Sequence, residues 1–260
     1  MSQSSPEQIR KRLEAEGKGS KGDWYKPKEG TGYIRIGPPW KEDADYWKDR
    51  IQHGSFDKSG KNPPVYCAKN DVNPKTDKPR KCLVCEAYKE LKGNKTDYGK
   101  ALGKLIYPRT DTLWNVLVVK KAEETSGKLE SVKYETGKFA VMSLGKKWSK
   151  NLLDIFTEDE YREHSALGVT DPRYGRFIKA KRTGMDLDTE ITFRALKEQP
   201  MSPKDERKAL LATLVDLDKL ATGSSDEELK SFLLRMKKKA KSEADEDDDD
   251  NEEDTDSDSD

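Results

Sequence analysis

The sequence is poor in cysteine and histidine, with three cysteines and two histidines among 260 residues. An odd number of cysteines cannot all pair, and a disulfide framework would not persist in a reducing compartment. Hydrophobic residues make up only 32% of the chain, and no apolar run approaches the length that crosses a bilayer. No stretch has the pattern of a signal peptide. These absences argue against a disulfide-stapled secreted domain and a membrane protein, and we expect an intracellular protein.

The net charge of zero conceals two oppositely charged regions. Residues 242–260 contain 13 of the 50 acidic residues and none of the 50 basic ones, so residues 1–241 carry a net charge of +13. A basic body followed by an acidic tail is typical of a protein that binds a polyanion. The tail has almost no apolar surface to bury, so we expect it to be disordered. The tail would compete with the polyanion for the basic surface. Alternatively, it would only increase solubility.

Hydrophobic patterning predicts an α+β fold, mainly β, with late helices. Residues 112–121, TLWNVLVVKK, predict a central strand because they are apolar on both faces. Hairpins are expected over 129–144 and 176–196, the second turning near Gly184. An OB-type barrel is one candidate for such a sheet.

Two helices are expected to close the folded part. Ser202 followed by Pro203 predicts the start of a helix over 204–220. A capping box from Ser225 to Glu228 predicts the start of a last helix. The basic, glycine-containing residues 1–21 are interpreted as a mobile N-terminal arm.

Four of the five cysteine and histidine residues fall within one window, as His53, Cys67, Cys82 and Cys85. Thiolate and imidazole are the ligands that tetrahedral zinc prefers, and the C-x-x-C pair can turn two thiolates onto one ion. The window is rich in polar residues, so a metal would supply the shape that a core of its own could not. We therefore predict one structural Zn²⁺, with four protein ligands and no open position. The alternative is a small buried Cys67, a surface His53 and an accidental C-x-x-C pair.

Basic and aromatic residues alternate in three other segments, as expected where cations follow phosphates and rings stack on bases. The first segment precedes the central strand, and the second contains Trp148. The third is RFIKAKR, residues 176–182, in which strand alternation places Phe177, Lys179 and Lys181 on one face. Strand aromatics are more often core residues, and Trp114 and Trp148 are expected to be packed. The candidate nucleic-acid contacts in these segments are Lys100, Lys104, Tyr107, Arg109, Lys146, Lys147, Phe177, Lys179 and Lys181.

The ordered motifs together resemble a known family, the single-stranded DNA-binding (helix-destabilising) proteins of T-even-like tailed phages. The resemblance covers most of residues 22–236. It rests on the entry segment GDWYKPKEGTGYIRI, the His53, Cys67, Cys82 and Cys85 series, WNVLVVKK, VKYETG, GKKW and VDLDKL.

This resemblance implies an OB-fold core over residues 22–241, with an inserted zinc subdomain at about 51–90. It implies sequence-independent binding that coats and protects single-stranded DNA during phage replication, recombination and repair, in the cytoplasm of the infected bacterial host. Trp114 and Tyr134 fall in the family's DNA-binding strands. Arg10, Lys11 and Arg12 fall in its self-association segment. The tail, 242–260, would autoinhibit binding and recruit replication and recombination proteins.

Two rival functions are less well supported by the residues. A zinc-containing transcription or recruitment factor would act mainly by protein docking and would have little intrinsic affinity for single strands. An enzyme is not expected, because the chain has no H-E-x-x-H motif, no P-loop and a full metal shell. An unnoticed nuclease site would be detected by incubating the protein with Mg²⁺ and labelled DNA.

Overall fold

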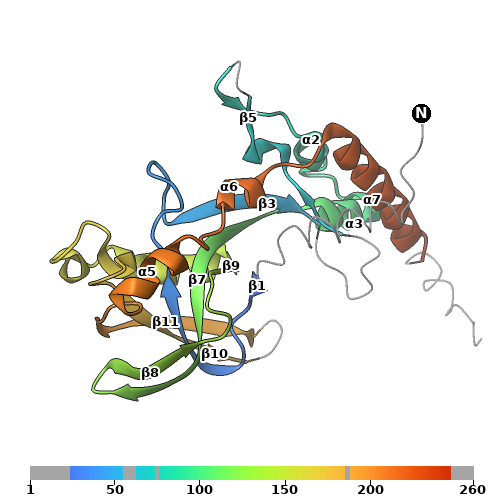
Figure 1. Cartoon of the computed structure of the whole chain (residues 1–260). Coiled ribbons are helices and arrows are strands. Elements are labelled where there is room, and N and C mark those ends of the chain that lie inside the picture. Colours follow the sequence, from blue (N-terminus) through green and yellow to red (C-terminus); the bar gives the residue numbers. More distant parts are fainter. Residues whose placement is uncertain (1–23, 55–62, 74–75, 185–187, 247–260) are drawn as a thin grey trace, which may run out of the picture. The chain divides into compact units, whose positions relative to one another are not determined.

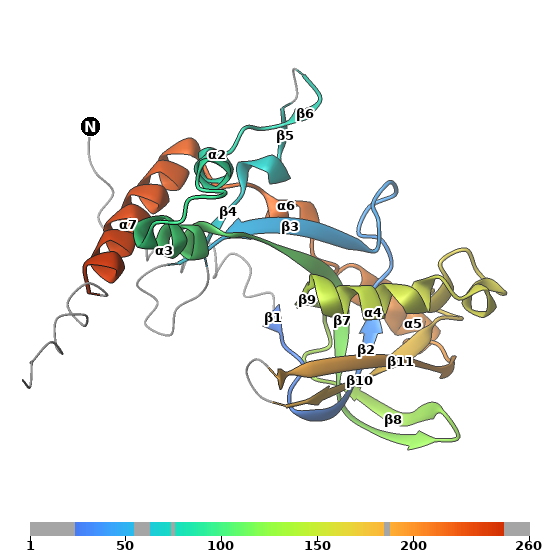
Figure 2. The same cartoon turned by 180° about the vertical axis from the view of Figure 1, so that it is seen from behind.

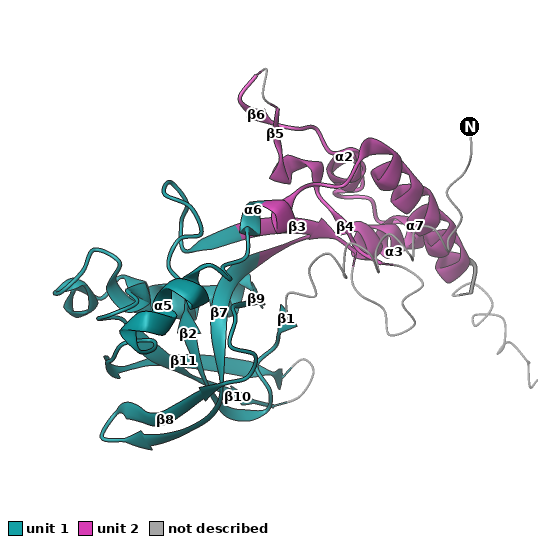
Figure 3. Ribbon diagram, in the orientation of Figure 1, with its two compact units in different colours: residues 1–48, 112–218 teal, residues 49–111, 219–260 magenta. Residues whose placement is uncertain are grey.

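The computed structural model describes residues 24–54, 63–73, 76–184 and 188–246 (Figure 1). The chain divides into two compact units (Figure 3). Unit 1 consists of residues 1–48 and 112–218, and unit 2 of residues 49–111 and 219–260. The expected self-association residues Arg10, Lys11 and Arg12, and tail residues 247–260, lie outside the described part of the chain.

Unit 1 is built on a mainly antiparallel sheet with the strand order β1-β9-β7-β2-β10-β11, and β8 also pairs with β7 (Figure 2). β1 pairs with β9 in parallel. The strands are β1 (Trp24–Tyr25), β2 (Gly30–Ile36), β7 (Pro108–Thr125), β8 (Lys128–Tyr134), β9 (Ala140–Gly145), β10 (Arg176–Thr183) and β11 (Glu190–Glu198). Its helical elements are α4 (Lys146–Phe156), η2 (Asp159–Arg162), η3 (Gly168–Thr170) and α5 (Lys204–Leu211).

The expected central strand is confirmed as β7. Its residues 113–117 are all buried, and the strand lies between β9 and β2. One face of the sheet contacts α4, whose Leu152 and Ile155 share a core with Ile34, Trp114 and Ile178. A strand in this position is covered on both faces, which explains why its sequence does not alternate between apolar and polar residues.

One of the two expected hairpins is confirmed and the other is wrong. β10 and β11 form an antiparallel hairpin, as predicted. Residues 129–144 do not pair with themselves, because β8 pairs with β7 and β9 pairs with β1. Ser126 and Gly127 form the β7–β8 turn with φ of +52° and +82°, the positive values that a two-residue type I′ turn requires.

The tip of the β7–β8 hairpin is held against β11. Lys197 N donates to Gly127 O at 2.8 Å. The Gln199 side chain bonds Leu129 twice, accepting from its amide at 2.9 Å and donating to its carbonyl at 2.6 Å. The hairpin thereby covers a second small core on the other face of the sheet, formed by Leu129, Phe177 and Leu196.

Unit 2 contains shorter strands and three packed helices. Its elements are β3 (Trp47–His53, which begins in unit 1), β4 (Val65–Tyr66), η1 (Ala68–Asn70), β5 (Val72–Asn73), β6 (Lys78–Pro79), α2 (Leu83–Glu90), α3 (Asp97–Ile106) and α7 (Asp226–Glu246). Helices and strands are about equally represented in the described residues. The α+β class is as expected, but the emphasis on β is wrong, because α2 forms within the cysteine window and α3 follows it.

The last helix begins as predicted, with Ser225 N donating to Glu228 Oε2 at 2.9 Å and Glu228 N to Ser225 Oγ at 3.2 Å. Every third or fourth residue of α7 is buried against α2 and α3 in unit 2. α7 continues to Glu246, so residues 242–246 of the expected disordered tail are helical.

The helix expected over 204–220 is interrupted. It forms α5 and then α6 (Leu217–Ala221), separated by residues 212–216. The buried Asn115 side chain donates to Val215 O at 2.9 Å and accepts from Val215 N at 3.0 Å. These bonds occupy main-chain groups that a continuous helix would use internally, which accounts for the break.

Among the residues that the structure describes, no helix is both long enough and apolar enough to cross a membrane.

Candidate metal centre and nucleic-acid interface

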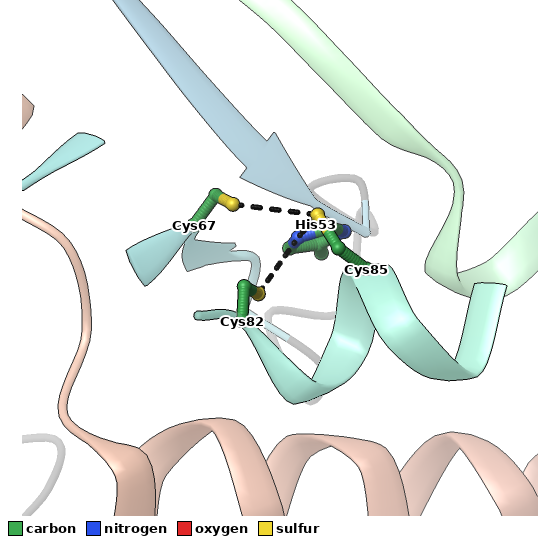
Figure 4. A group of neighbouring side chains, drawn as sticks. All are labelled: His53, Cys67, Cys82 and Cys85. Atoms are coloured by element: carbon green, nitrogen blue, oxygen red, sulfur yellow. Dashed lines mark hydrogen bonds between the residues drawn. The ribbon is translucent and has the colours of Figure 1, made fainter. Parts of the chain in front are cut away.

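Three short elements of unit 2 bring the four candidate ligands together (Figure 4). His53 ends β3, and its pairing with Val65 of β4 sets Cys67 immediately after β4, beside the same strand. Cys82 is the N-cap of α2, and Cys85 lies in the first turn of that helix. The C-x-x-C pair therefore directs both sulfurs toward one point, as its spacing predicted, and does so from the start of a helix.

Three of the six separations between the donor atoms match a tetrahedral site. His53 Nε2 lies 3.5 Å from both Cys82 Sγ and Cys85 Sγ. Cys67 Sγ lies 3.5 Å from Cys85 Sγ, and all four donor atoms lie within 4.8 Å of one another. Bond lengths of about 2.0–2.3 Å to a zinc ion imply tetrahedral edges of about 3.5–3.8 Å. The four residues thus fit one metal ion, and all four are buried.

The orientation of His53 is set by a second hydrogen bond. Its Nδ1 lies 3.0 Å from the carbonyl oxygen of Ile106, the last residue of α3. Because a carbonyl only accepts, Nδ1 carries the proton, and the lone pair of Nε2 can face the sulfurs. In metal-binding histidines, the ring nitrogen that does not bind the metal usually donates to a carbonyl or a carboxylate, as Nδ1 does here.

Proton sharing within the cluster favours a thiolate. The thiols of Cys67 and Cys85, followed by His53, hold the pKa of Cys82 far below its usual value. Contacts with Cys82 and Cys85 raise the pKa of Cys67. Burial alone lowers the pKa of His53, but hydrogen bonds to Cys82, Cys85 and the Ile106 carbonyl raise it to about 9. A metal cation would replace these shared protons, because it binds the deprotonated ligands.

The cluster is embedded in a hydrophobic core. Cys67, Cys82 and Cys85 share this core with residues of all three helices, among them Val84, Leu102, Ile106, Leu229, Phe232 and Met236. The window was expected to have no core of its own. In the structure, α3 and α7, which lie outside the window, supply much of the apolar surface that covers the cysteines.

Polar contacts also fix the loops that carry the ligands. The Asn70 side chain forms hydrogen bonds with both main-chain groups of Ile51. Its Oδ1 accepts from Ile51 N at 2.8 Å, and its Nδ2 donates to Ile51 O at 2.9 Å. Asp71 accepts from Arg80 at 3.1 Å and from Gly223 N at 2.9 Å. The segment before α7 is therefore bonded to the loop that follows Cys67.

A shallow surface depression in unit 2 gathers one group of predicted contacts. The ring of Tyr107 is half-exposed and packs edge-on against Tyr88 at 5.5 Å. Lys100 also forms an ion pair with Asp97 at 2.8 Å. The aromatic and cationic residues that line the depression are Tyr88, Lys92, Lys100, Lys104, Tyr107 and Arg109.

Tyr88 and Lys92 were missed by sequence reasoning. Tyr88 lies one helical turn after Cys85, and Lys92 one turn further, so this spacing was the available signal. It was overlooked because the window was interpreted only as a metal site.

Two predicted aromatic contacts are wrong. Trp114 has no exposed surface and belongs to the main core of unit 1. This agrees with the expectation that aromatic residues in strands are usually packed in the core. Phe177 does share a sheet face with Lys179, but it is 1% exposed because the β7–β8 hairpin covers it. Neither ring can stack on a base in this structure.

The remaining residues of unit 1 differ in accessibility. Tyr134 is partly buried, its hydroxyl donates to Met201 O, and burial raises its pKa to about 12. Lys179 is engaged by Glu124 at 2.7 Å, and Lys147 by Glu190 at 3.4 Å. Among the lysines predicted as contacts in unit 1, Lys146, Lys147 and Lys181 are exposed. The other histidine, His164, is exposed, and its Nδ1 lies 3.0 Å from Glu198 Oε2.

Comparison of the chain with protein-family models and with curated protein sequences gives no match.

Proposed function

We propose that this protein binds single-stranded DNA without sequence preference, and that it coats and protects the strand during phage replication, recombination and repair. The observation that carries the proposal is the depression in unit 2. There, the exposed ring of Tyr107 lies among Lys92, Lys100, Lys104 and Arg109. A ring among cations provides a surface for a base and partners for the adjoining phosphates.

The metal in this proposal is one structural Zn²⁺. Three thiols and one imidazole form a donor set that suits zinc better than it suits Mg²⁺ or Ca²⁺. Four protein ligands complete the tetrahedron, so the ion would have no position for substrate. Its role would be to hold β4, α2 and the end of α3 together, and thereby to position Tyr107.

An OB-type barrel is the fold that we propose for unit 1. Closure of the sheet β7-β2-β10-β11 is supported by the contacts of the β7–β8 hairpin with Lys197 of β11 and with Gln199, which directly follows β11. Exposed Lys146, Lys147 and Lys181 of this unit would add phosphate contacts. The acidic tail would compete with DNA for basic surface and recruit replication and recombination proteins.

The test is titration of oligo-dT against the full chain and against a chain ending at Lys241. We expect tight binding to oligo-dT, weaker binding to duplex, and a salt slope of about −0.7 per phosphate neutralised. The shorter chain should bind more tightly at low salt. Equal binding of duplex and single strand at moderate salt would refute the proposal. A shorter chain indifferent to oligo-dT would favour the alternative, a zinc-containing recruitment factor that acts by protein docking.

A further inference from the structure

Glu124, close to the end of β7, receives donors from three other strands of unit 1. Tyr33 Oη of β2 donates to Glu124 Oε2 at 2.8 Å. Lys179 Nζ of β10 donates to the same oxygen at 2.7 Å. Arg194 Nη2 of β11 donates to Oε1 at 3.1 Å. One carboxylate is therefore bound by a phenol, an ammonium and a guanidinium.

The three donors are held close together by the sheet itself. Lys179 is the direct cross-strand partner of Tyr33 on one side and of Arg194 on the other. Directly opposed residues present their side chains on the same face of a sheet, only about 5 Å apart. Lys179 Nζ also lies 5.8 Å from the centre of the Tyr33 ring. The donors would remain neighbours if the carboxylate moved away.

This donor set can bind a phosphate as readily as a carboxylate. Guanidinium and ammonium groups form short, charge-assisted hydrogen bonds to both kinds of anion. The group also reaches the surface, with side-chain exposures of 30% for Lys179, 67% for Arg194 and 19% for Glu124. A phosphate oxygen from solvent could therefore approach the donors that Glu124 now occupies.

We propose that Tyr33, Lys179 and Arg194 form a phosphate subsite, which Glu124 fills in the free protein and which a phosphate of the bound DNA strand takes over. This inference rests on the proposed function. The exchange replaces three hydrogen bonds to a carboxylate with equivalent bonds to a phosphate, so the net gain in affinity is small while Glu124 is charged. Exposed Lys181, two residues along β10, extends the same face toward the next phosphate.

The decisive variant is Glu124→Gln, which preserves the size of the side chain and an oxygen for Tyr33 but removes the competing charge. We expect its affinity for oligo-dT at low salt to rise about tenfold. Its salt slope should steepen by about 0.7, because in the wild-type protein the displaced Glu124 carboxylate takes up a cation and offsets the counterion that the phosphate releases. In the double variant Glu124→Gln with Lys179→Met, this gain should disappear.

The matched control is Glu123→Gln, which removes the same charge from the exposed neighbouring position on β7. We expect it to change affinity by less than about twofold, because a more distant exposed charge is screened. Thermal unfolding of each variant confirms that it is folded. Equal changes in the two single variants, or a weaker Glu124→Gln, would refute the subsite and leave the proposed function intact. If no variant and no wild-type chain bound oligo-dT, the proposed function would fail, and the subsite with it.

Discussion

The Nδ1 atom of His53 lies 3.0 Å from the carbonyl oxygen of Ile106, the residue immediately before Tyr107. This contact connects the candidate metal centre to the exposed ring of the depression in unit 2. Holding His53 in place also holds the C-terminal end of α3, because the imidazole and the carbonyl are bonded to each other. Loss of the metal should therefore disturb the basic surface as well as the cysteine cluster.

The first prediction concerns metal content. The natively purified chain should contain one zinc ion, and His53→Asn should weaken metal retention by more than about 100-fold, since loss of a supporting partner alone costs 10–100-fold. A chelator should lower the helix content of the wild-type protein, because metal binding contributes to folding. Metal analysis by mass spectrometry and far-ultraviolet circular dichroism measure both effects.

The matched control is His164→Asn, which alters the exposed histidine of unit 1. It should retain one zinc ion per chain. Absence of zinc from the wild-type chain, or equal loss in the two histidine variants, would contradict the metal assignment.

The second prediction concerns α7. Phe232 is 1% exposed and packs in the core that contains the cysteines. Phe232→Ala should reduce the free energy of unfolding by about 3–5 kcal/mol, through lost apolar burial and a residual cavity. It should also accelerate zinc release to a chelator. Leu234, on the same helix but 62% exposed, is the control, and Leu234→Ala should change the free energy of unfolding by less than about 0.5 kcal/mol. Similar effects at the two positions would refute this role for α7.

The third prediction concerns Tyr107. Tyr107→Ala should weaken oligo-dT binding by about 1–3 kcal/mol, the contribution of one stacked base, which corresponds to about fivefold or more. Tyr107→Phe should bind normally, because stacking needs the ring and not the hydroxyl. Tyr174→Ala is the control, since Tyr174 is a similarly exposed tyrosine of unit 1. Fluorescence anisotropy distinguishes the three variants, and an unaffected Tyr107→Ala protein would remove this ring from the binding surface.

The fourth prediction concerns the pH dependence of stability through Asp171. Burial alone raises the pKa of this carboxyl, but hydrogen bonds from Ser165 and from the amides of Tyr174 and Arg173 bring it below its usual 3.8. A carboxyl with a lowered folded-state pKa stabilises the protein above its unfolded-state pKa, and this contribution is lost as the pH falls through the lowered value.

Asp171→Ala should therefore reduce the free energy of unfolding by about 1–3 kcal/mol at pH 7, because it leaves main-chain amides unpaired. The difference from wild type should shrink below about pH 4 as the wild-type carboxyl is protonated. Asp45→Ala, at an exposed position of the same unit, should show little difference at either pH. Denaturant unfolding across this range measures the effect, and a difference that grows in acid would contradict the prediction.

Residue chemistry and local periodicity determined several features from the sequence by itself. The scarcity of cysteine and histidine made their grouping in one window informative, and thiol and imidazole chemistry then indicated a metal. The apolar residues on both faces of the segment 112–121 predicted a strand covered on both faces, and Ser225 with Glu228 predicted a helix start. Each depends on atoms close together in the chain, so the information is local.

Only the tertiary structure decided which surfaces other segments cover and which charges meet. Alternation set Phe177 and Lys179 on one face, but the distant hairpin tied to β11 buries the ring, and Glu124 engages the lysine. Asn115 interrupts a helix a hundred residues away, and α7 completes the core around the cysteines. These outcomes depend on packing between segments remote in sequence, which side-chain pattern and propensity do not encode locally.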